Sequence, residues 1–309
     1  MIKYYYKSLR TAALQEVDDF KRGTWVYVAH PTAGELARLS EKFNLDPGIL
    51  EDAMDEDEVP RLEKDEGVTY VFVRFAYKND RGDVLTAPVL IAFGGEYVIT
   101  ISVKHLPALD FLLRGRTMFA TTQRAKLILL ILSHISDQYD MFISQTSRKI
   151  KAIRSRLRSQ GITNKDFIDF AFIEDELNEF LDALQPNNAT LRRLLVGRHI
   201  PLFEEDQDLV EDLMLNNGQS IEASKANLRA IENIRDAYSA ISANNLNRII
   251  LILTIATILI ALPNLFFGMY GMNIPLPFEH ARWMFGAILG FNAFLILIVL
   301  AIARKKRII

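Results

Sequence analysis

The sequence contains no cysteine among its 309 residues. A chain without cysteine forms no disulfide framework and no thiolate metal site, and it has no cysteine nucleophile. An excess of charge of one sign is also missing, because 36 Lys and Arg nearly balance 38 Asp and Glu. Proteins that bind nucleic acid normally carry a basic surplus, so this balance predicts no nucleic-acid partner.

The common catalytic motifs are absent as well. The sequence has no P-loop, no GxSxG and no HExxH, and its five histidines are scattered along the chain. We therefore predict that the protein is not an enzyme and needs no cofactor. The first ten residues lack the apolar core of a secretory signal peptide, so we expect the N-terminal region to stay in the cytoplasm.

Charge is missing from two long segments near the C-terminus. Ile249–Tyr270 has 22 uncharged residues and Trp283–Ala303 has 21. A helix needs about 20 apolar residues to cross the hydrocarbon core of a bilayer. We expect two membrane spans joined by the short link 271–282. The alternative is a pair of buried helices in a soluble protein, which the basic tail 304–309 disfavours.

The basic residues around these segments predict their orientation. Arg248 precedes the first span, whereas Arg304, Lys305, Lys306 and Arg307 follow the second. Loops rich in Lys and Arg stay on the cytoplasmic side, so both termini should be cytoplasmic in a multi-pass plasma-membrane protein. Neither span contains Asp or Glu, which argues against a proton-relay transporter.

The residues before the spans predict an α/β domain over 1–121. Strand-like patterns occupy 24–29, 68–77, 84–93 and 96–103, and a helical pattern occupies 32–43. The acidic stretch 51–66 is expected to be a solvated loop, with a cation-attracting surface as the alternative.

Helical patterns alone follow over 122–200. Arg124–Ser159 is basic in its second half and Lys165–Leu184 is acidic, so we expect an antiparallel hairpin. A further helical pattern runs without a turn signal into the first span and predicts one stalk helix over 201–270. The sequence leaves open a bend at Asn216–Gly218, because glycine costs about 1 kcal/mol relative to alanine inside a helix.

A short motif follows the first span, namely Tyr270-Gly271-Met272-Asn273. It resembles the YGMN signature of the CorA family of two-transmembrane divalent cation transporters. Its position, the short link behind it and the basic tail are similar to the family pattern. Asp236, Tyr238, Ser242 and Asn247 also resemble the DxY…S…N run that precedes the membrane in this family.

The resemblance implies an α+β fold class, with a cytoplasmic α/β domain and long helices followed by a two-helix transmembrane hairpin. It also implies a homopentameric, funnel-shaped channel for Mg²⁺, with Co²⁺ or Ni²⁺ as further ions. The implied selectivity filter is Gly271, Met272 and Asn273, and the implied pore-lining residues are Asn247, Leu253, Asn264 and Gly268.

These residue types suit a hydrated ion. Mg²⁺ gives up water reluctantly, so a ring of five Asn273 amides could bind it with its water shell. Gly271 permits a close backbone approach, and Met272 is expected to pack against the second span. Leu253 would form an apolar ring that stops ions by dewetting. For Asn264, hydrogen bonding between helices is the alternative.

The resemblance further implies that cytoplasmic Mg²⁺ closes the channel by bridging carboxylates of adjacent subunits. Asp212 falls where the family carries such a carboxylate, and Asp80 and Asp83 are our candidates for its partner. Competing ligands occur near the start of the stalk: Glu204, Glu205, Asp206, Asp208 and Glu211. A solvated helix start is the alternative for that cluster.

Two other functions remain open from sequence. A zinc transporter of the same fold is one alternative, although Met272 favours magnesium. A membrane-anchored enzyme or sensor is the other, and the missing catalytic motifs disfavour it.

Overall fold

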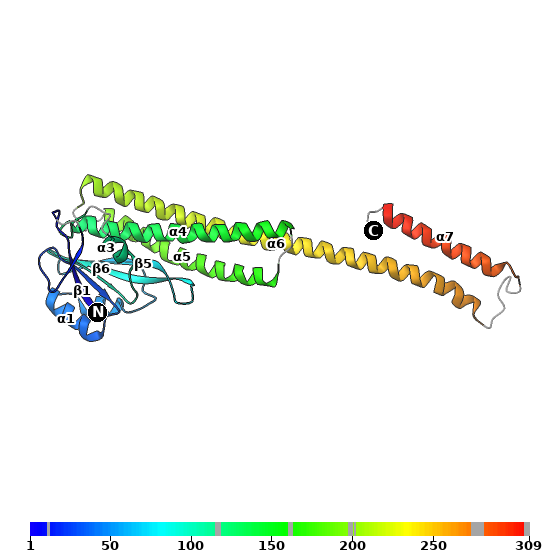
Figure 1. The fold of residues 1–309 in the computed structure, drawn as a ribbon, viewed down its shortest axis with the longest axis horizontal. Coiled ribbons are helices and arrows are strands. Elements are labelled where there is room, and N and C mark those ends of the chain that lie inside the picture. The colour runs from blue at the N-terminus through cyan, green and yellow to red at the C-terminus, as the bar shows by residue number, and fades with distance from the viewer. Residues whose placement is uncertain are drawn as a thin grey trace. The chain divides into compact units, whose positions relative to one another are not determined.

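The computed structural model describes residues 1–10, 13–114, 119–159, 163–196, 200, 202–272 and 281–305. The chain forms two compact units, Met1–Glu232 and Asn233–Ile309. Each unit contains part of the long helix α6, Glu204–Tyr270 (Figure 1).

The first unit contains a seven-stranded sheet in the order β2-β1-β3-β7-β6-β5-β4. The strands are β1 Ile2–Tyr6, β2 Gln15–Val17, β3 Trp25–Ala29, β4 Arg61–Asp65, β5 Val68–Lys78, β6 Val84–Phe93 and β7 Val98–Ser102. Only β3 and β7 pair in parallel, and the other neighbours are antiparallel.

The hairpin of β5 and β6 is the longest pairing in this sheet, from Thr69 opposite Phe93 to Lys78 opposite Val84. Its β-branched and aromatic residues suit a pleated, buried surface. The side-chain oxygen of Asn79 closes the turn, because it accepts hydrogen bonds from the backbone of Arg81 and Asp83, each at 2.9 Å.

Helices cover both faces of the sheet (Figure 1). On one face, α1 Ala33–Phe43 and α2 Pro47–Asp52 close a core of side chains from β3, β5, β6 and β7. The side chains of Thr32 and Glu35 form a capping box that starts α1. On the other face lie α3 Pro107–Leu113, α4 Arg124–Ser159 and α5 Asn164–Val196.

The helices α4 and α5 form the expected antiparallel hairpin, and α4 has the bounds expected from its periodicity. Arg156 pairs with Asp166 at 2.5 Å, and the hydroxyl of Thr146 donates to Glu176 at 2.7 Å. These two contacts fix the register of the hairpin at two levels.

The helix α5 continues past Leu184 and through Pro186, beyond the end that the sequence suggested. Its next residue, Asn187, lies against the edge of β5. The Asn187 amide accepts from the backbone N–H of Arg74 at 2.9 Å and donates to the Arg74 carbonyl at 2.8 Å. Tyr139 of α4 donates to the same carbonyl at 3.1 Å, and burial raises the pKa of this hydroxyl.

The acidic stretch 51–66 is not a solvated loop throughout, so that expectation was wrong. It contains the end of α2 and the whole of β4, and Arg61 of β4 pairs with Asp52, Glu58 and Glu63. The pairing offsets the negative charge and allows the strand to form. The sequence patterns also missed β1, β2 and α3.

The second unit contains the rest of α6 and α7, Met284–Lys305. Both helices are long and apolar enough to cross a membrane. The helix α6 runs without interruption through Asn216–Gly218, where the sequence had left a bend open.

The amides at 187 and 188 allow a matched test of this packing. We expect Asn187→Leu to lower the free energy of unfolding of the first unit by about 1–3 kcal/mol, because the Arg74 N–H loses its partner in a buried position. Asn188→Leu should have a much smaller effect, because the buried Asn188 side-chain oxygen has no hydrogen-bond partner among the described residues. Urea unfolding of the full-length protein, followed by circular dichroism, measures both. Equal destabilisation by the two variants would contradict this account.

Candidate functional site

The membrane segment of α6 has two different sides. Half-buried positions recur along one of them: Ile255, Leu259, Leu262, Pro263, Phe266 and Tyr270. At 3.6 residues per turn these positions share one face of the helix. Phe266 contacts Phe291 of α7 with ring centroids 5.3 Å apart, so this face is the one that α7 covers.

The opposite side of α6 carries three of the predicted pore residues. Leu253, Asn264 and Gly268 fall within an arc of about 60°, nearly opposite the side that α7 covers. All three are exposed, and Leu253 keeps 66% of its surface free. Among the described residues, no atom lies within 4 Å of a Cβ added at Gly268. The described part of the chain therefore leaves this face open for another molecule.

Asn247 does not share that face. It is exposed, but it lies about 100° around α6 from the centre of the other three. The angular positions along α6 therefore do not place Asn247 on the face that carries Leu253, Asn264 and Gly268.

The threonines in this part of α6 and Asn264 differ in their hydrogen bonding. The hydroxyls of Thr254 and Thr257 donate to carbonyls of their own helix, those of Ile250 at 2.8 Å and Leu253 at 2.9 Å. Asn264 has no hydrogen-bond partner among the residues that the structure describes. Helix-to-helix bonding within the chain thus explains neither the threonines nor Asn264.

The predicted filter begins where α6 ends. The backbone N–H of Gly271 donates to the carbonyl of Phe267 at 3.0 Å, and that of Met272 to Met269 at 3.3 Å. The side chain of Met272 is 55% exposed, so it is not packed into α7 as expected. Asn273 lies outside the described residues.

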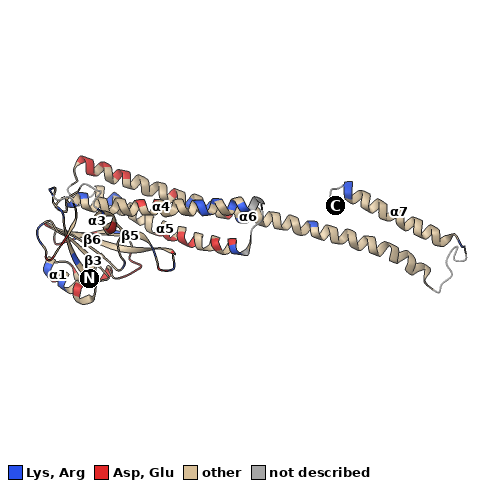
Figure 2. Ribbon diagram, viewed as in Figure 1, with Lys and Arg blue, Asp and Glu red and all other residues tan. Residues whose placement is uncertain are grey.

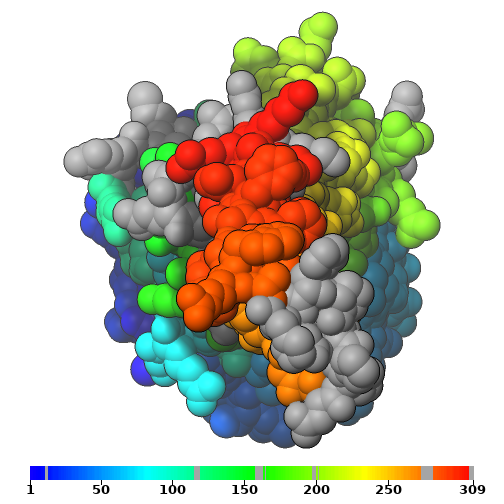
Figure 3. Space-filling model, turned by 90° about the vertical axis from the view of Figure 1, so that its right-hand side faces the viewer, coloured from blue at the N-terminus to red at the C-terminus, as the bar shows by residue number. Residues whose placement is uncertain are grey.

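The helix α7 has a buried polar residue on the side that faces α6. Asn292 donates to the carbonyl of Ile288 at 2.9 Å, and its side-chain oxygen has no partner in the part of the chain that the structure describes. The rest of α7 is largely uncovered. Figure 3 shows the face of α7 (orange to red) turned to the viewer, with no other described helix over it.

The predicted regulatory carboxylates are exposed and separate. Asp80 and Asp83 lie in the turn between β5 and β6, and the amide of Asn79 donates to Asp83 at 3.0 Å. Asp212 lies near the start of α6, which Figure 1 places by the other end of these strands. No group of three acidic or histidine side chains in the described part of the chain is placed to hold a metal ion. One chain alone therefore does not bring the candidates together.

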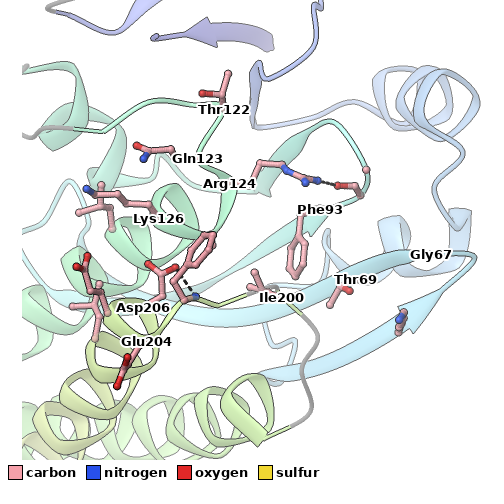
Figure 4. A pocket seen from close by; sticks show the side chains of 18 residues that line it. Gly67, Thr69, Phe93, Thr122, Gln123, Arg124, Lys126, Ile200, Glu204 and Asp206 are labelled. Carbon is pink, nitrogen blue, oxygen red and sulfur yellow. Dashed lines mark hydrogen bonds between the residues drawn. The ribbon is translucent and has the colours of Figure 1, made fainter. Parts of the chain in front are cut away.

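The acidic start of α6 and several basic residues line a cavity of about 1200 Å³ (Figure 4). Its lining includes the acidic residues Glu204, Glu205 and Asp206 and the basic residues Lys64, Arg124 and Lys126. Asp206 accepts from the backbone N–H of Phe203 at 3.2 Å and so caps the helix. This arrangement fits a capped and charge-balanced helix start better than a metal site.

Charged residues are distributed unevenly along the chain (Figure 2). Lys and Arg gather on the second half of α4, and Asp and Glu on α5 and the start of α6. The second part of α6 and most of α7 carry almost no charge, as a hydrocarbon environment requires.

Sequence reasoning missed two polar contacts between α4 and α6. The hydroxyl of Ser136 donates to the side-chain oxygen of Asn217 at 2.7 Å, and Ser147 and Asn227 bond to each other three turns further along. The sequence signal that could have revealed these contacts is the spacing of polar residues on α6, which follow one another at steps of three and four residues.

The chain matches the family described as CorA-like Mg²⁺ transporter protein over residues 20–305. The cobalt/magnesium transport protein CorA of Methanocaldococcus jannaschii is 24% identical over 289 residues, which cover 91% of this chain and 90% of the relative. The magnesium transport protein CorA of Campylobacter jejuni is 23% identical over 305 residues, with 91% and 90% covered. The complete structure of the CorA magnesium transporter from M. jannaschii aligns with a TM-score of 0.85 and 21% identity, covering 99% of this chain and 98% of that one. The sheet, the long helices and the apolar hairpin agree with these matches, and the chain belongs to the CorA-like Mg²⁺ transporter family.

Proposed function

We propose that five copies of this chain form a membrane pore that carries hydrated Mg²⁺ into the cytoplasm. The observation that carries the proposal is the two-sided membrane segment of α6. Its one side is covered by α7, and Leu253, Asn264 and Gly268 on the opposite side are exposed in the part of the chain that the structure describes. Copies arranged around an axis would give these side chains a shared conduit.

The ion is inferred from the family and from the chemistry of the amides. The family description and both relatives named above state magnesium, and one relative also states cobalt. Neutral amide oxygens suit an ion that keeps its water. We therefore propose Mg²⁺ as the main substrate, with Co²⁺ or Ni²⁺ as further ions.

The direction of transport follows from the membrane potential. Moving a divalent ion through 100 mV releases about 4.6 kcal/mol, at about 2.3 kcal/mol per charge. The basic residues beside the spans support an orientation with both termini in the cytoplasm.

Cytoplasmic Mg²⁺ is proposed to close the pore by bridging Asp212 of one copy to Asp80 and Asp83 of the next. All three side chains are exposed. Among the described residues Asp80 and Asp212 form no hydrogen bond or ion pair. Each is thus free to share a cation with a neighbouring copy.

The first prediction concerns the filter. We expect Asn273→Ala to reduce Mg²⁺ flux into liposomes by at least about tenfold, the equivalent of about 1.4 kcal/mol. Asn292→Leu is the matched control, because Asn292 faces α6 within the hairpin, and it should retain flux. Equal flux in wild type and Asn273→Ala would contradict the proposal. Zn²⁺ uptake faster than Mg²⁺ uptake by the wild type would favour a zinc transporter.

The second prediction concerns the apolar ring. Leu253→Ser should keep Mg²⁺ flowing at cytoplasmic concentrations that stop the wild type, because a polar ring no longer excludes water. Leu251→Ser introduces the same change about 160° around the helix and should leave closure intact. Patch recordings at graded Mg²⁺ compare the two variants. Leak through both, or through neither, would count against a pore on the Leu253 face.

The third prediction concerns closure by Mg²⁺. Combined replacement of Asp212, Asp80 and Asp83 by alanine should raise the half-inhibiting Mg²⁺ concentration by about tenfold, equivalent to about 1.4 kcal/mol. Glu232→Ala removes an exposed carboxylate of α6 that is not among the candidate ligands, and this control should respond like the wild type. An unchanged response of the triple variant would remove these carboxylates from the mechanism.

A further inference from the structure

The side of α6 that faces inward in the first unit is polar in its middle. Buried or half-buried side chains recur there at steps of four and three residues: Leu213, Asn217, Ser220, Ser224, Asn227 and Ile231. This spacing is that of the contact positions in a coiled coil, which are normally apolar. Four consecutive contact positions of α6 are instead amides or hydroxyls.

Both amides in this set, Asn217 and Asn227, form hydrogen bonds with serines of α4. Asn217 is 3% exposed and Ser136 is 6% exposed, and their side chains lie 2.7 Å apart. Asn227 and Ser147 exchange hydrogen bonds at 2.8 and 3.1 Å. The two serines are separated by eleven residues and the two amides by ten, so the pairs lie about three turns apart along parallel helices.

The partner helix is held firmly. Leu127, Ile128 and Ile131 of α4 are completely buried, and Tyr139 donates to β5. Movement of α6 relative to the sheet must therefore occur at its contact with α4. A shift of one turn, about 5.4 Å, would break both pairs together and leave buried polar groups without partners.

Polar contact positions in a helical seam lower stability but select one register. We propose that Asn217 and Ser136 are positioning residues that hold α6 in one register against α4 and thereby set the Mg²⁺ concentration at which the pore closes. This inference rests on the proposed function, because α6 also carries the pore face. It assigns a role in coupling to residues that are neither part of the filter nor carboxylates, although Asn217 lies only about 7.5 Å along α6 from Asp212.

The experiment compares five variants of the full-length protein in liposomes. They are Asn217→Leu, Ser136→Ala, the double variant of these two, the swap that combines Ser136→Asn with Asn217→Ser, and the control Asn216→Leu. Asn216 is the exposed neighbour of Asn217. The readouts are the half-inhibiting Mg²⁺ concentration, the flux without cytoplasmic Mg²⁺, and hydrogen exchange of α6 over residues 213–228.

We expect each single variant to shift the half-inhibiting concentration by about threefold to tenfold, the range of one hydrogen bond. The double variant should shift it no further than the singles, since both remove the same bond. The swap should restore the response, the control should match the wild type, and the flux without cytoplasmic Mg²⁺ should not change.

Two results would overturn the inference. One is a half-inhibiting concentration within about twofold of wild type in both single variants, less than the loss of one hydrogen bond produces. The other is a shift that the control reproduces or that the swap leaves uncorrected. If Mg²⁺ does not inhibit the wild type at all, the proposed closure is wrong. Hydrogen exchange is then the one remaining test of whether Asn217 and Ser136 hold the register of α6 against α4. Faster exchange in the single variants, reversed by the swap, supports the positioning role, whereas unchanged exchange refutes it.

Discussion

The lack of hydrogen-bond partners in a hydrocarbon layer is the constraint on which the structure depends. Backbone groups there must bond within the segment, so both apolar segments are helices. The hydroxyls of Thr254 and Thr257 follow the same rule by bonding to their own helix. Asn264 does not, and it lies on the uncovered side of α6. A polar group in that place needs water or another copy, and the proposed pore between copies would supply both.

Asparagine side chains complete the fold at points where the backbone cannot. Asn79 closes the β5–β6 turn, Asn187 pairs with the open edge of β5, and Asn217 joins α6 to α4. An amide carries both a donor and an acceptor and can therefore replace a missing backbone partner. In this protein the amides connect the sheet to the hairpin and the hairpin to the stalk.

The sequence predicted the elements whose residues repeat with a clear period. The strands β5 and β6, the helix α4 and the two apolar helices have such patterns, and the structure confirms them. The short strands β1 and β2 depend on pairing with distant residues, so local patterns did not reveal them. Low helix propensity left open a bend at Asn216–Gly218, but the helix continues there, and the buried side chain of Asn217 accepts a hydrogen bond from Ser136. The partner of Asp212 stays a prediction, because contacts between copies are not encoded in the periodicity of one chain.

The empty surroundings of Gly268 have a consequence for how variation at this position should be interpreted. The described part of one chain offers no steric reason for excluding alanine there, since a Cβ added at this position would meet none of its atoms within 4 Å. Any intolerance of alanine must then arise when copies come together. Position 268 could therefore distinguish the requirements of folding from those of the proposed assembly: the described part of one chain leaves room for the methyl group of alanine there, and an effect of that methyl group on transport would point to contacts between copies.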